Sequence, residues 1–287
     1  MKVKALICIA AALATAVPAS SAWAFGTAET LVTESTDFTG NTYALIVPGI
    51  SKDSDDSREQ ETLLKQFQET LVTTFGIPSE NVTYLAGQAA SDKGAPTAAE
   101  LDEALKTEAG RVTASDRFIF YYRGQANIIN GALRINLAGP DITHEDLAGW
   151  LSRVKCACTL IILDCPNAGV AIESLDGPGR IIICGERGDQ PYASRFSGYF
   201  VPALTDTAAD YNKDGRISLL EAYRSAVTEI DDEYQQKGLL KTENALLEDD
   251  GDGTPAHQPW EHIEDSFDGT AAATFFFVPR ARKEAKQ

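Results

Sequence analysis

The segment Leu160-Ile-Ile-Leu-Asp164-Cys165-Pro166-Asn167-Ala168-Gly169 indicates the fold class most directly, because an unbroken aliphatic run ends there in polar and turn-forming residues. A strand that is covered on both faces has this composition, since neither of its sides meets water. In open α/β sheets, binding sites lie beyond the carboxyl ends of such strands. The segment therefore predicts a buried parallel strand with candidate site residues directly after it.

Similar apolar runs occur on both sides of this segment, and helical patterns separate them. The predicted strands are Tyr43–Val47, Val82–Leu85, Phe118–Tyr122 and Ile181–Cys184. Predicted helices begin near Ser57-x-x-Gln60, at Thr97-x-x-Glu100 and at Thr143, because these residues form capping signals before apolar positions with helical spacing. Asn130-Gly131 predicts a hairpin. The alternation of strands and helices predicts an α/β protein with a mostly parallel central sheet in three layers.

The two ends of the chain predict export and a short tail. Lys2 and Lys4, the apolar run of residues 5–17 and Ala22-Trp-Ala24 are typical of a signal peptide over residues 1–24. We therefore expect an exported protein, periplasmic or extracellular, with a flexible arm over 25–40. An α/β domain is expected over 41–205, and a loop, a long helix and a final strand (Thr274–Val278) over 206–280 are expected to complete it. Residues 281–287 form a basic tail.

Charge and cysteine content limit the partners. The chain has 42 acidic against 25 basic residues, a formal net charge of −17. Such a surface repels nucleic acid and anionic membranes, so we expect neither as a partner, and it favours the binding of cations. Four cysteines follow the predicted leader: Cys156, Cys158, Cys165 and Cys184. A Cys165–Cys184 disulfide and two buried thiols both remain open, because spacing does not determine pairing.

Residues 210–221 fit a twelve-position calcium loop of the EF-hand type. Gly215 occupies the position that requires a positive φ, and Ile217 the apolar eighth position. The expected Ca²⁺ ligands are Asp210, Asn212, Asp214, Arg216 through its backbone carbonyl, Ser218 and Glu221. The alternative to a calcium-binding loop is an acidic turn before a helix. A single loop of this kind indicates a structural clamp. For the later run Glu248–Gly253, an auxiliary cation site and a solvated acidic turn both remain open.

A second segment, Phe118-Ile-Phe-Tyr-Tyr-Arg123-Gly124-Gln125-Ala126, precedes the first by one predicted helix. In this order the two segments resemble the caspase–legumain superfamily of cysteine peptidases, in which one strand ends in Gly-His-Gly and a later one in Asp-x-Cys-x-Ser/Ala-Gly. Gly177-Pro-Gly-Arg180, the calcium-type loop and the run Thr242–Gly253 are similar to segments of bacterial legumain-like members. The resemblance covers most of the chain and implies a caspase-like fold.

The resemblance also implies that both catalytic residues are substituted. Pro166 stands at the position of the nucleophile and Gln125 at that of the histidine. Proline has no nucleophilic group, and glutamine does not exchange a proton near neutral pH. We therefore expect a non-catalytic, calcium-binding relative with a peptide or protein ligand in a cleft near Gln125 and Asn167. One alternative is a cysteine hydrolase that uses Cys165 with His144, His257 or His262, and another is a calcium-stabilised structural or surface-interaction protein.

Overall fold

The computed structural model describes residues 38–87, 94–261 and 268–277, which belong to one compact unit. The predicted signal peptide, most of the predicted arm, the basic tail and His262 lie outside the described residues. No helix in the described ranges is both long enough and apolar enough to cross a bilayer.

The protein is α/β, with a central sheet of six strands in the order β2-β1-β3-β7-β8-β9. The strands are β1 Thr42–Pro48, β2 Val82–Tyr84, β3 Arg117–Arg123, β7 Cys158–Asp164, β8 Arg180–Cys184 and β9 Leu246–Glu248. Neighbouring strands are parallel except β9, which pairs antiparallel with β8. All five predicted strands of the sheet are confirmed. In the register of β3 and β7, Arg123 lies opposite Asp164, so the two candidate segments end side by side.

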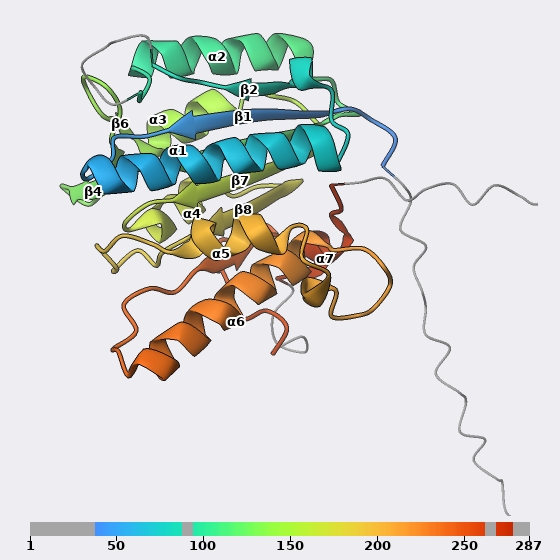
Figure 1. Ribbon diagram of the computed structural model, residues 1–287. Helices are drawn as coiled ribbons and strands as arrows, with labels where there is room; N and C mark the ends of the chain where they lie inside the picture. The colour runs from blue at the N-terminus through green and yellow to red at the C-terminus, as the bar shows by residue number, and fades with distance from the viewer. Residues whose placement is uncertain (1–37, 88–93, 262–267, 278–287) are drawn as a thin grey trace, which may run out of the picture. The chain divides into compact units, whose positions relative to one another are not determined.

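Helices cover both faces of the sheet, an arrangement compatible with the expected three layers (Figure 1). One face carries α1 Ser54–Glu69, α5 Phe196–Ala203, α6 Leu219–Lys237 and α7 Thr270–Thr274; the other carries α2 Ala98–Arg111, α3 His144–Leu151 and α4 Ile172–Leu175. The predicted hairpin is also confirmed, with β4 Ala126–Ile129, β5 Ala132–Ile135 and the short β6 Ile142–Thr143 in a second sheet. Its turn residues Asn130 and Gly131 both have positive φ, 53° and 82°, as a two-residue hairpin turn of this type requires.

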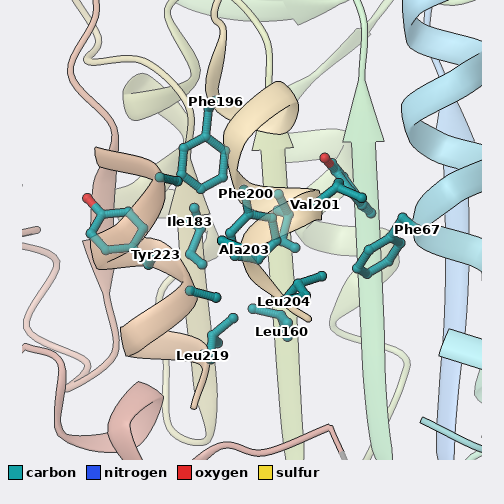
Figure 2. Close-up of a cluster of buried hydrophobic side chains, with 14 of the residues drawn as sticks. Phe67, Leu160, Ile183, Phe196, Phe200, Val201, Ala203, Leu204, Leu219 and Tyr223 are labelled. Atoms are coloured by element: carbon teal, nitrogen blue, oxygen red, sulfur yellow. The ribbon is translucent and has the colours of Figure 1, made fainter. Parts of the chain in front are cut away.

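Strands that alternate their side chains between two apolar layers account for the continuous aliphatic runs. Leu160 and Ile162 belong to the core under α1, α5 and α6, whereas Ile161 and Leu163 belong to the core under α2, α3 and α4. Figure 2 shows part of the first core, where Phe196 stacks on Phe200 with 5.0 Å between ring centroids. This packing holds the carboxyl ends of β3, β7 and β8 in fixed positions.

The predicted helix starts are confirmed at Thr97 and Thr143, and each forms a capping box, with Glu100 and Asp146 respectively. The start predicted at Ser57 is wrong. Asp53 caps α1 instead, because its carboxylate accepts from the backbone N–H groups of residues 55 and 56. Gln60 is buried and its amide nitrogen donates to two backbone carbonyls below the helix, those of residues 49 and 123, so it does not act as a capping residue.

The final strand predicted at Thr274–Val278 is wrong over its described part. Residues 270–274 form α7, and residues 275–277 are outside any strand. Phe275 and Phe277 are nevertheless buried, because the extended chain packs both rings into the core. The backbone carbonyl of Phe275 accepts a hydrogen bond from the N–H of Leu219 at the start of α6, not from a neighbouring strand.

Candidate functional site

A small pocket lies at the carboxyl ends of β3 and β7. It is lined by Asp56, Arg123, Gly124, Gln125, Asp164, Cys165, Pro166, Ala193 and Ser194. The two segments identified in the sequence therefore meet there, joined by a hydrogen bond from the N–H of Gly124 to the carbonyl of Asp164 (3.2 Å). Glycine is needed at 124, since a Cβ would lie 2.6 Å from the Cα of Gly49. The space is about 260 Å³ when the open, solvent-filled mouth is included, but the volume comparable to a cavity volume is only about 20 Å³, so the pocket is a shallow depression.

Acidic groups surround one buried guanidinium in this pocket. Arg123 is only 6% exposed and forms ion pairs with Glu59 (3.1 Å), Asp56 (3.5 Å) and Asp164 (3.5 Å). Asp164 also accepts hydrogen bonds from the backbone N–H and the hydroxyl of Ser197 through Oδ2. Its other oxygen, Oδ1, has no hydrogen-bond partner among the described residues. Asp164 thus lines the pocket and carries a buried acceptor that has no donor among the described residues.

Cys165 is one of the residues that line the pocket, but its side chain is buried in the hydrophobic core. Its exposed fraction is 1%, and burial, reinforced by the nearby Cys184 thiol, raises its pKa well above the usual range. Within the described ranges no hydrogen bond joins its sulfur to an imidazole: His144 pairs with Glu145, and His257 contacts Lys241 and the carbonyl of residue 245. Cys156, Cys158, Cys165 and Cys184 are all free thiols. A buried neutral thiol is a poor nucleophile.

The two positions at which the resemblance implies substitutions line the pocket, but Asn167 does not. Gln125 and Pro166 are both lining residues. The backbone of Gln125 is held by two hydrogen bonds: its N–H donates to the carbonyl of Ile50 (2.8 Å), and its carbonyl accepts from Tyr122 Oη (2.8 Å). Asn167 has a positive φ of 59° and its amide donates to the carbonyl of Gly188. The expectation that Asn167 lines the cleft is wrong, because this turn directs its side chain toward the loop after β8.

Buried acids near the end of β8 were missed at the sequence level. Glu186 is 0% exposed, and neither of its carboxylate oxygens has a hydrogen-bond partner within the described residues. Burial, followed by repulsion from Glu243 and Asp164, raises its pKa to about 10, so this carboxyl is protonated at neutral pH. The sequence offered one signal for Glu186: it lies two residues after the predicted strand that ends at Cys184. Residues at the carboxyl ends of neighbouring parallel strands share one edge of the sheet, and Asp164 lies at that edge.

The predicted calcium loop is a tight turn that leads into α6. Gly215 has a φ of 83°, and its N–H donates to Asp210 (2.9 Å). Glu221 accepts from the N–H of Asn212 (3.1 Å) with one oxygen, and from the N–H and hydroxyl of Ser218 with the other. Its carboxylate is therefore folded toward the loop, while the carboxylate of Asp210 accepts from the N–H groups of Asp214 and Gly215. This donor set is the one that a calcium ion prefers.

A closer group of carboxylates lies elsewhere. Among the described residues, three acidic side chains have oxygens within 4.8 Å of one another only at Glu248, Asp250 and Asp268, and not in the 210–221 loop. Burial and the neighbouring acids raise the pKa of Asp268 to about 7 and that of Glu248 above its usual value. The sequence identified the run Glu248–Gly253 but not Asp268, which is distant from it in the chain.

Comparison with known proteins finds no family model that matches the chain, and no curated protein matches it in sequence.

Proposed function

We propose that this protein is a calcium-binding, non-catalytic relative of the caspase–legumain peptidases that binds a peptide or protein segment in the pocket beside Gln125. The observation that carries the proposal is the composition of the pocket. Glutamine and proline line it at the positions where the resemblance implies the histidine and the nucleophile, while the nearby thiol of Cys165 is buried. Because neither residue of the dyad that the resemblance implies is present, we expect the pocket to bind a ligand without cleaving it.

The charges of the pocket favour a basic side chain as the ligand group. Three carboxylates surround one guanidinium, and Oδ1 of Asp164 lacks a hydrogen-bond donor among the described residues. An ammonium or amide group entering the pocket would satisfy this oxygen. A net charge of −17 would also attract a basic segment over longer distances. We therefore expect a peptide with Lys, Arg or an amide side chain at its centre.

Peptide binding is tested with labelled peptides that differ only at a central Lys, Gln or Glu. The Lys and Gln peptides should bind more tightly than the Glu peptide. Gln125→Ala should weaken binding several-fold, because the side chain lines the pocket. Gln66→Ala, the same change on the exposed part of α1, should have no effect. If the parent binds no peptide but is still stabilised by calcium, the structural-protein alternative replaces this proposal.

Catalysis is tested with a thiol-reactive probe and a peptide library, both with and without calcium. The proposal expects neither labelling at Cys165 in the folded protein nor cleavage. Cleavage that requires calcium and disappears in Cys165→Ala would overturn the proposal in favour of a cysteine hydrolase.

Calcium binding by residues 210–221 is the second part of the proposal, and two observations support it: the twelve-position pattern of oxygen-bearing side chains and the positive φ of Gly215 (83°). Bidentate binding would require Glu221 to release its hydrogen bonds to Asn212 and Ser218. At 100 times its Kd the ion would stabilise the fold by about 2.7 kcal/mol. Glu221→Gln should remove that contribution, as measured by thermal unfolding at several calcium concentrations. A calcium-dependent contribution as large in this variant as in the parent would refute the loop assignment.

A further inference from the structure

We propose that Glu248, Asp250 and Asp268 bind a further divalent cation, of the calcium type, independently of the 210–221 loop. The three side chains offer carboxylate oxygens that all lie within 4.8 Å of one another. Calcium–oxygen distances are about 2.3–2.6 Å, so two oxygens on one ion lie at most about 5 Å apart. The observed spacing meets this limit without any movement of the backbone.

The buried carboxylate of Glu248 is the observation that points to a ligand. Glu248 is 0% exposed, and Oε1 accepts a hydrogen bond from the N–H of Gly251 (2.9 Å). Its second oxygen, Oε2, has no hydrogen-bond partner among the described residues. The nearby charged groups that act on it include Asp176, Asp250 and Asp252, which carry the same sign. A buried carboxylate in such surroundings is costly, and a cation at its free oxygen would remove both the repulsion and the missing contact.

The backbone holds Glu248 where it is and brings Asp268 to it. Glu248 lies in β9, opposite Ile182 of β8, so it cannot move toward solvent without breaking the sheet. The N–H of Asp249 donates to Asp268 (3.1 Å). The carboxylate of Asp249 is itself used, because it accepts from the N–H groups of Gly269 and Ala272 (2.7 Å each). Asp249 thus joins the two segments and brings Asp268 beside the acids on either side of it.

The ligand chemistry selects the class of ion. Carboxylate oxygens alone favour hard cations, such as calcium or magnesium, over zinc or copper. Asp250 is exposed, so waters can complete a coordination shell of six to eight oxygens, which calcium accepts in irregular geometry. The bound ion would fasten residues 268–277, which place Phe275 and Phe277 in the core, to the edge strand β9.

The test counts calcium ions per chain by titration calorimetry of chelator-treated protein. The parent should bind two ions if the loop also binds. Glu248→Gln should lose one of them, and Asp250→Asn, at an exposed position where folding is not at risk, should weaken one site by more than about tenfold because a charged ligand is lost. Glu69→Gln, an equal change at an exposed position of α1, is the control and should bind as the parent does.

The outcomes separate this proposal from the loop assignment. Calcium binding by Glu248→Gln and Asp250→Asn that equals the parent's would overturn the site. A single ion that is lost in Glu221→Gln alone would also overturn it while supporting the loop, and no binding by the parent would overturn both. If the parent binds a single ion, its loss in Glu248→Gln but not in Glu221→Gln would support the site and refute the loop. In the presence of a chelator, Glu248→Gln should be at least as stable as the parent, because the substitution removes a buried charge. Marked destabilisation of the variant under the same condition would indicate a merely structural role for this side chain.

Discussion

Replacing Glu186 by glutamine should make the protein more stable at neutral pH. The side chain is 0% exposed, and its two oxygens lack hydrogen-bond partners among the described residues. Burial and the neighbouring acids raise its pKa from 4.5 to about 10. The folded protein therefore keeps this carboxyl protonated at pH 7, whereas the unfolded chain releases the proton. Glutamine has nearly the same shape and is neutral in both states.

The magnitude follows from the linkage between protonation and folding. Because the folded state holds the proton more tightly, stability is greatest below pH 4.5 and falls as the pH rises toward 10. Each pH unit in this window lowers the free energy of unfolding by about 1.4 kcal/mol. At pH 7 the loss amounts to about 3 kcal/mol. An amide has one more donor to leave unsatisfied than the protonated acid, so we expect a net gain of about 1–3 kcal/mol for Glu186→Gln.

The measurement is urea unfolding at pH 4.5, 6, 7 and 8, with Glu69→Gln as the exposed control. The gain from Glu186→Gln should be near zero at the lowest pH and should increase steadily toward pH 8. A gain that does not depend on pH, or a variant less stable than the parent at pH 7 and 8, would refute the assignment of a buried, protonated carboxyl.

Three further outcomes are expected. Phe200→Ala removes a fully buried ring and should lower the free energy of unfolding by about 3–5 kcal/mol in urea; a loss below about 1 kcal/mol would show that the core relaxes around it. The thiols of Cys165 and Cys184 are buried and their pKa values are raised. Both thiols should therefore react with a disulfide reagent only as fast as the protein unfolds. Rapid labelling of either thiol, mapped by mass spectrometry, would contradict their burial. Thr97→Ala breaks the capping box with Glu100 and should lower the free energy of unfolding by about 1 kcal/mol, whereas an unchanged urea midpoint would indicate that the cap contributes nothing.

Local signals in the sequence were sufficient for most of the parallel sheet and for two helix starts. The aliphatic runs that end at Tyr122, Leu163 and Cys184 became central strands because only a doubly covered strand buries side chains on both faces. Thr97 and Thr143 formed capping boxes because the interaction needs only residues three positions apart. Asn130-Gly131 formed its hairpin for the same local reason.

The failed predictions involve residues whose surroundings come from distant segments. Gln60 resembled a capping residue, but it bonds the carbonyls of Gly49 and Arg123 under the helix. Phe275 and Phe277 resembled a strand, but no strand within the described ranges pairs with them, and the sixth strand of the sheet is β9 instead.

The sequence by itself determined the class of fold, the edge of the sheet where the candidate residues gather, and which side chains stand at the two substituted positions. Only the tertiary structure decided that the Cys165 thiol is buried, that Glu186 is enclosed with no hydrogen-bond partner among the described residues, and that Asp268 lies beside Glu248. Periodicity and capping act through neighbours in the chain, whereas desolvation and charge repulsion depend on atoms that approach only when the layers pack together.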